Sequence, residues 1–108
     1  MYDLNTNKHK RFDIGDRTVL WFFDEEEHDA SKLLPYNLFI LDSGGNELWS
    51  LKDLAKREDT CVLLRIEGGR LYFATFGGFS AWVDAETLEV SDIKMQRYGG
   101  IVWDLSRL

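Results

Sequence analysis

Continuous and alternating apolar runs, separated by short polar turns, cover most of this chain. The run from Thr18 to Phe23 is β-branched and aromatic, and Tyr36 to Leu41 forms a second such run after a polar loop. The sequence Asp42 to Asn46 contains residues that tolerate positive φ, so the chain can reverse there into a strand over Glu47 to Ser50. These patterns predict a β-hairpin in the first half of the chain.

One short segment has helical rather than strand spacing. Leu51, Leu54 and Ala55 repeat at the spacing of a helix, and Ser50 precedes them as a candidate N-cap. We therefore expect one short helix near Leu51 to Lys56, of two turns at most.

Glycine pairs in the second half predict a meander of antiparallel strands. Gly68-Gly69 and Gly77-Gly78 suit two-residue hairpin loops, which fix the register of the strands on either side. The pairs expected across the first turn are Ile66 with Leu71, Leu64 with Phe73 and Val62 with Thr75; across the second they are Phe76 with Phe79, Ala74 with Ala81 and Tyr72 with Val83. Both faces of such a sheet are apolar, which predicts that another sheet or a partner covers each of them. Leu88 to Met95 provides a fourth strand.

Two similar phrases suggest an internal repeat. Asp42 and Asp84 each end an apolar strand and open a turn, and they lie 42 residues apart. Leu41 to Leu48 and Val83 to Leu88 resemble the inner hairpin of β-propeller repeats, whose period is roughly 40 to 45 residues. This resemblance implies a half-propeller of two packed sheets, since a closed ring needs about four or more blades. The alternative is that any meander of hairpins produces such spacings.

The expected architecture is a single, mainly β domain over residues 1–108. It has two packed antiparallel meander sheets of about eight strands in all, with one short helix. The alternative is an α+β fold in which a longer helix covers a single sheet.

The charge and composition of the chain then narrow the range of possible functions. The net charge of −6 and the pI near 4.8 argue against a nucleic acid or an anionic membrane surface as partner, because phosphates attract Lys and Arg patches. The chain has no apolar run long enough for a membrane span, and residues 1–11 do not resemble a secretory signal. These features predict a cytoplasmic protein with a cationic partner.

Residues suited to chemistry are few. Cys61 lies inside an apolar run and is expected to be a buried thiol, and neither His9 nor His28 adjoins an activated nucleophile. A metal site at Glu25, Glu27, His28 and Asp29 would match no known loop spacing. We therefore expect no catalytic residues, no metal and no cofactor, the alternative being a small β enzyme with carboxylates far apart in sequence.

The acidic run from Asp24 to Asp29 is the feature that most needs a functional explanation. It places five carboxylates in six residues between two apolar strands. It can be a solvated loop that keeps edge strands from aggregating, or a patch that mimics nucleic acid phosphates and binds the basic cleft of an enzyme. Neighbouring aromatic residues could anchor a partner or belong to the core. The predicted partner-binding residues are Asp24, Glu25, Glu26, Glu27, Asp29, Trp21 and Tyr36.

In size, acidity and lack of catalytic motifs, the chain resembles the immunity proteins of bacterial toxin–immunity pairs, including those of contact-dependent growth inhibition systems. The resemblance implies a protein that neutralises one cognate toxin, often a basic nuclease, by occluding its active site or substrate groove. We expect a monomer when the chain is free, with a homodimer as the alternative. The alternative is a scaffolding β module that self-associates or docks into an assembly. Exposure of Phe76 and Phe79, or of a strand at Ile101 to Asp104, would favour this alternative because large exposed apolar patches usually mark interfaces.

Overall fold

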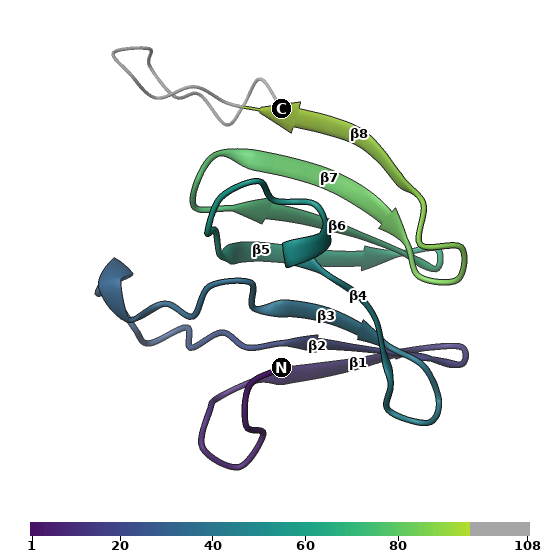
Figure 1. Cartoon of the computed structure of the whole chain (residues 1–108), viewed down its shortest axis with the longest axis horizontal. Helices are drawn as coiled ribbons and strands as arrows, with labels where there is room; N and C mark the ends of the chain where they lie inside the picture. The colour runs from purple at the N-terminus through teal and green to yellow at the C-terminus, as the bar shows by residue number, and fades with distance from the viewer. Residues whose placement is uncertain (96–108) are drawn as a thin grey trace.

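The computed structural model describes residues 1–95, with Ala30 described by its backbone alone, and these residues form two four-stranded antiparallel sheets (Figure 1). The strands of the first sheet are β1 (Lys10–Ile14), β2 (Arg17–Trp21), β3 (Leu38–Leu41) and β4 (Glu47–Ser50). The strands of the second are β5 (Cys61–Glu67), β6 (Arg70–Thr75), β7 (Phe79–Asp84) and β8 (Val90–Met95). Within each sheet, neighbouring strands are consecutive in the sequence, which confirms the prediction of two antiparallel meanders. Figure 1 shows β8 on the side of the second sheet that is remote from the first.

The core lies between the two sheets, because each presents one apolar face to the other. Val19, Leu38 and Ile40 of the first sheet belong to the same buried cluster as Leu71 and Phe73 of the second. This shared cluster confirms that the two sheets pack together.

A second, smaller cluster covers the opposite face of the first sheet. It contains Leu20, Phe22, Phe39 and Leu41, with the partly buried Tyr2 packed against it. The first sheet is therefore apolar on both faces.

The first sheet covers one face of the second sheet, and within residues 1–95 no further sheet covers the other face, so its predicted cover by a partner stays a prediction. Its inner face is buried against the first sheet, whereas Tyr72 and Trp82 on its outer face are half-buried and Leu63 is 51% exposed. Within the described part of the chain, the outer face remains accessible.

The short helix predicted near Leu51 to Lys56 is instead a single 3₁₀ turn, η2 (Leu51–Asp53). The Asp53 carboxylate accepts the Ser50 N–H at 2.8 Å, and the N–H groups of Leu54 and Ala55 donate to the Leu51 carbonyl. Only one turn forms because strongly polar residues follow Ala55, leaving no apolar face to offset the cost of helix nucleation. The other 3₁₀ turn in the described residues, η1 (Ala30–Lys32), lies in the long connection between β2 and β3.

The register between β5 and β6 agrees with the prediction near the turn and departs from it at the far end. Ile66 pairs with Leu71 and Leu64 with Phe73, as expected. A bulge then places Cys61, rather than Val62, opposite Thr75. The pattern of glycines carries no signal for this bulge.

The predicted register between β6 and β7 is wrong by one residue. Tyr72 pairs with Trp82, rather than with Val83, because the loop has three residues instead of two. The N–H of Gly78 donates to the Thr75 carbonyl at 3.1 Å, and the N–H of Phe79 donates to the Thr75 hydroxyl at 3.1 Å. The last strand residue is therefore Thr75, and Tyr72 and Trp82 lie together on the outer face.

The repeated phrases around Asp42 and Asp84 have the same structural role. Each aspartate opens the turn between the third and fourth strands of its sheet. The Asp42 carboxylate accepts the N–H groups of Gly44 and Asn46 at 2.9 and 2.8 Å, and the Asp84 carboxylate accepts those of Glu86 and Thr87 at 2.8 and 3.0 Å. The repeat therefore supplies turn closure.

Polar contacts join the two sheets at one end of the core. Asn37 is buried, and its Nδ2 donates to the carbonyls of Phe22 and Cys61, each at 3.0 Å, while its Oδ1 accepts the Cys61 N–H at 2.6 Å. The indole N–H of Trp21 also donates to the Cys61 carbonyl, at 3.0 Å. The Asn37 side chain thus links the first residue of β5 to the segment that connects β2 with β3 in the first sheet.

The guanidinium of Arg17 makes a further link between the sheets. It donates to the carbonyls of Ala85 and Glu86 at 3.1 and 3.3 Å, which ties the β1–β2 turn to the β7–β8 turn.

Among residues 1–95, no helix has the length and hydropathy required to cross a membrane. The predicted strand at Ile101 to Asp104 lies outside the described residues.

Candidate functional site

The acidic loop, residues 24–29, follows β2 and is ordered by its own carboxylates. The Asp24 carboxylate accepts the Glu26 N–H at 3.0 Å, and that of Glu27 accepts the Asp29 N–H at 3.1 Å. Asp29 in turn accepts both the N–H and the hydroxyl of Ser31, at 3.0 and 2.7 Å. Such side-chain to backbone bonds are typical of Asx turns. The loop is therefore a series of closed turns.

These hydrogen bonds also affect titration within the loop. The hydroxyl and N–H of Ser31 lower the pKa of Asp29, because both donate to its ionised form. At neutral pH this end of the loop is fixed in its charged state.

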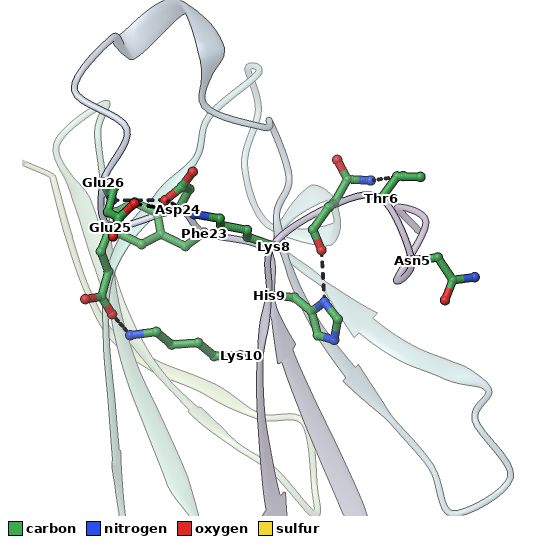
Figure 2. A pocket seen from close by; sticks show the side chains of 10 residues that line it. Asn5, Thr6, Lys8, His9, Lys10, Phe23, Asp24, Glu25 and Glu26 are labelled. Atoms are coloured by element: carbon green, nitrogen blue, oxygen red, sulfur yellow. Dashed lines mark hydrogen bonds and ion pairs between the residues drawn. The ribbon is translucent and has the colours of Figure 1, made fainter.

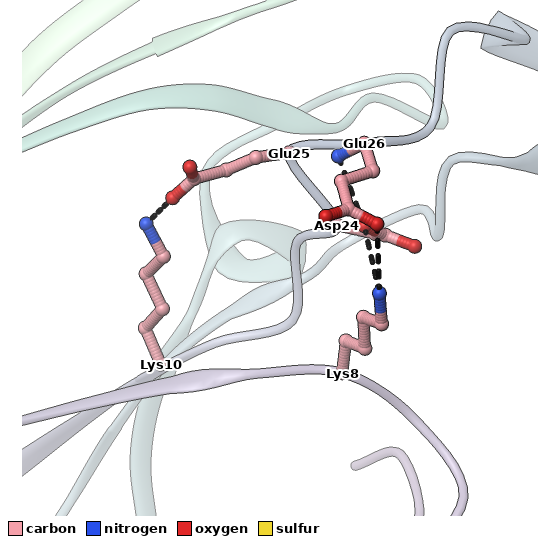
Figure 3. A network of polar contacts seen from close by, with 5 residues as sticks. All are labelled: Lys8, Lys10, Asp24, Glu25 and Glu26. Carbon is pink, nitrogen blue, oxygen red and sulfur yellow. Dashed lines mark hydrogen bonds and ion pairs between the residues drawn. The ribbon is translucent and has the colours of Figure 1, made fainter.

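Two lysines from the N-terminal segment face the acidic loop across a cleft. The Lys8 ammonium lies 3.5 Å from a carboxylate oxygen of Asp24 and 3.6 Å from one of Glu26, and Lys10 forms an ion pair with Glu25 (Figure 3). The neighbouring carboxylates, that of Asp24 first, raise the pKa of Lys8. The two lysines thus pair with three of the five carboxylates of the loop, and the loop keeps an excess of negative charge.

The cleft between the two segments has a volume of about 530 Å³. Its walls are residues 5–10 on one side and residues 23–26 on the other (Figure 2). Figure 2 shows Lys8 and Lys10 extending toward the carboxylates, while His9 between them is directed toward the Asn7 carbonyl, 3.0 Å from its Nδ1. This alternation is that of an extended chain, whose successive side chains point to opposite sides.

Most of the charged groups that form this cleft are well exposed. The side chain of Glu26 is 87% exposed and that of Glu25 is 62% exposed. Exposed ion pairs of this kind contribute only about 0 to 1 kcal/mol, so other cations can replace the lysines at little cost.

The aromatic residues predicted as partner anchors lie elsewhere. Trp21 is 7% exposed, stacks on Phe23 at a centroid distance of 4.7 Å, and lies under the Lys10 ammonium at 5.5 Å. Its indole is thus part of the core and packs against Phe23, which lines the cleft. Tyr36 is half-buried with a positive φ of 50°, and its N–H donates to the Asp59 carbonyl at 2.7 Å. It does not line the cleft.

Of the residues that line the cleft, Asp24, Glu25 and Glu26 were predicted as partner-binding residues, whereas residues 5–10 and Phe23 were not. Strand alternation from Lys8 to Phe12 was the available signal for the two lysines. Phe23 lines the cleft because it directly precedes the acidic loop and follows the end of β2.

Groups suited to catalysis or metal binding are scarce in the described residues. Burial raises the pKa of the Cys61 thiol far above its ordinary range, so the sulfur stays protonated and unreactive. Residues 1–95 contain no group of three or more His, Cys, Asp or Glu side chains that could hold a metal ion. The cleft brings carboxylates and ammonium groups together, an arrangement suited to electrostatic binding.

Comparisons of the chain with protein-family models, with curated proteins and with solved structures gave no match.

Proposed function

We propose that this chain is a non-enzymatic, acidic binding protein that neutralises a cationic protein toxin, as immunity proteins do. The acidic loop would cover the basic active site or substrate groove of the partner, for which a nuclease domain is the best candidate. The observation that carries the proposal is a set of exposed carboxylates on a backbone that their own hydrogen bonds hold in place.

Electrostatic steering supports this role. A compact negative patch accelerates encounter with a basic cleft, and such association can reach about 10⁸ M⁻¹s⁻¹ or more at low salt. Because the loop is already ordered, little conformational entropy is lost when the partner binds.

The N-terminal lysines indicate how binding would proceed. Lys8 and Lys10 occupy the positions that cationic side chains of a partner would take, and their exposed ion pairs exchange readily. Phe23 at the floor of the cleft offers an apolar contact that charge alone lacks.

The experiment is co-expression with a candidate toxin. The C-terminal domain encoded directly upstream of this chain is expressed with and without it in the same cells. Rescue of growth supports neutralisation. Toxicity that continues at full strength alongside abundant folded chain would contradict it.

A second candidate function, self-association as a scaffolding module, has one observation in its favour. Phe76 is 59% exposed, and Ile93 and Met95 of β8 are 53% and 70% exposed. Phe79, by contrast, is buried at 8% exposure, so the apolar surface at this turn is smaller than predicted. Light scattering after size exclusion distinguishes the two: a dimer that Met95→Ser converts to a monomer supports self-association, and a monomer at all concentrations rejects it.

A further inference from the structure

The outer face of the second sheet carries a row of large side chains in exact cross-strand register. Arg65 of β5 pairs with Tyr72 of β6, Tyr72 pairs with Trp82 of β7, and Trp82 pairs with Ser91 of β8. The Tyr72 and Trp82 rings lie 5.3 Å apart between centroids. The row therefore runs straight across all four strands of the sheet.

Two arginines lie over these rings. The guanidinium carbon of Arg65 is 5.4 Å from the Tyr72 centroid and 5.7 Å from that of Trp82, and the guanidinium carbon of Arg70 is 4.6 Å from the Trp82 centroid. A guanidinium stacks through its face but donates hydrogen bonds through its edge, so a stacked arginine can still bind a carboxylate. The rings thus pre-position two exposed cations.

A cleft of about 310 Å³ adjoins this row and is lined by Arg65, Tyr72, Trp82, Asp92 and Lys94. Two cations and one carboxylate therefore surround a floor of two aromatic rings. Among the other carboxylates near the row, Glu67 is paired with Arg65 at 3.2 Å, and Asp84 accepts hydrogen bonds from its own turn.

A buried hydroxyl on the same face as this cleft lacks a hydrogen-bond partner in the described part of the chain. Ser80 pairs with Lys94 and is two residues from Trp82 on β7, which places it on the same outer face. It is only 3% exposed, and its Oγ has no hydrogen-bond partner in the described part of the chain. Buried polar atoms without partners are rare in folded proteins, so each one calls for an explanation, and a bound group that supplies the missing hydrogen bond is one such explanation.

We propose that this face, here called the arginine–aromatic face, binds a segment of another protein that presents one carboxylate flanked by apolar residues. The carboxylate would accept hydrogen bonds from Arg65, Lys94 and Ser80, and the apolar neighbours would pack on Tyr72 and Trp82. Tryptophan, tyrosine and arginine are the residues most enriched at the centres of protein interfaces.

The charge of the chain favours a partner segment with one carboxylate over a segment with many. Its net charge of −6 and the presence of Asp92 in the cleft both oppose a run of acidic residues. Arg65 is already paired with Glu67, whereas Lys94 has no ion pair among the described residues, so one carboxylate matches the cation that the cleft leaves available. Apolar flanks match its aromatic floor. This surface belongs to the second sheet and is separate from the acidic loop.

The test is an NMR titration of the full ¹⁵N-labelled chain with two matched peptides, acetyl-Leu-Glu-Leu-amide and acetyl-Leu-Gln-Leu-amide. The signals followed are the indole N–H of Trp82, assigned with Trp82→Phe, and the Nε–H groups of Arg65 and Arg70. We expect saturable shifts with the glutamate peptide and affinity about ten-fold weaker for the glutamine peptide, because hydrogen bonds to charged groups are the strong ones.

Two variants and one control define the site. Arg65→Gln should reduce the affinity for the glutamate peptide to that of the glutamine peptide, and Ser80→Ala should weaken it about three-fold. Arg57→Gln, which alters an exposed arginine between η2 and β5, should leave the affinity unchanged.

Three results would overturn the proposal. One is the absence of saturable shifts in Trp82, and another is equal affinity for the two peptides. The third is tighter binding of a single-stranded oligothymidine, which would assign the face to nucleic acid. Because none of the variants alters residues 24–29, these outcomes leave the proposed neutralising function to be judged separately.

Discussion

Replacement of Asn37 by alanine should weaken the contact between the two sheets and lower the free energy of unfolding. The substitution removes all three hydrogen bonds of the amide and leaves the Cys61 N–H and the Phe22 carbonyl without that partner. The Cys61 carbonyl keeps its bond from Trp21. A buried polar group left unpaired costs about 1 to 3 kcal/mol, so two such groups predict a loss of about 3 kcal/mol in unfolding free energy. For a domain of this size, that loss corresponds to a fall of about 10 to 15 °C in Tm.

The assay is thermal and urea unfolding of Asn37→Ala beside Asn46→Ala. Asn46 is a matched control because its side-chain amide also makes a hydrogen bond, to Asp42 at 3.0 Å, but in an exposed turn. The control should change the unfolding free energy by about 0.5 kcal/mol or less. Hydrogen exchange should also accelerate at the Cys61 amide in Asn37→Ala alone. Equal stability of the two variants, with slow exchange at Cys61, would refute the role of Asn37 as the link between sheets.

Two further predictions concern turns. Gly77→Ala should destabilise the fold by about 1 to 2 kcal/mol, as measured by urea unfolding. The new Cβ would lie 2.7 Å from the Asp59 carboxylate, which accepts the Gly77 N–H. Gly44→Ala is the control and should be nearly neutral in the same measurement. Acid should weaken the fold through Asp42 and Asp84, whose pKa values are lowered chiefly by N–H donors of their own turns. Their contribution is complete above the unfolded pKa of about 4 and is lost as the pH falls through the folded pKa, so stability in Asp84→Asn should vary less with pH below 4.

Local patterns predicted the strands and turns because those elements depend on neighbouring residues. The hairpin around Asp42 and the meander from Cys61 to Met95 were predicted from turn residues and β-branched runs, and the structure contains both. The first strand, Lys10–Ile14, was missed because its alternation is short and follows a polar segment.

The errors in the prediction have tertiary causes. The Thr75 hydroxyl closes the β6–β7 loop one residue earlier than the glycine pair indicates, and Phe76 is held by the Thr60 carbonyl instead of pairing with Phe79. That shift concealed the row of Arg65, Tyr72 and Trp82, since Trp82 shares a face with Arg65 and Tyr72 only in the true register.

The contacts of the acidic loop could likewise not be predicted from neighbouring residues. Its charge was evident from consecutive residues, but its counter-ions, Lys8 and Lys10, lie at least 15 residues away in the sequence. Whether Trp21 faces solvent or core depends on the hydrogen bond from its indole to Cys61, a residue of the other sheet. Contacts between sheets of this kind have no local signal.

In the proposed function, the acidic loop neutralises a cationic toxin. The most direct measurement is growth rescue in cells that express the upstream toxin domain with either the natural chain or the triple variant Glu25→Gln, Glu26→Gln, Glu27→Gln. Lys52→Gln, at an exposed position in η2, is the control. We expect full rescue by the natural chain and by the control, and loss of rescue by the triple variant at equal expression and with an unchanged circular dichroism spectrum. Rescue by the triple variant equal to that by the natural chain would contradict the proposed function.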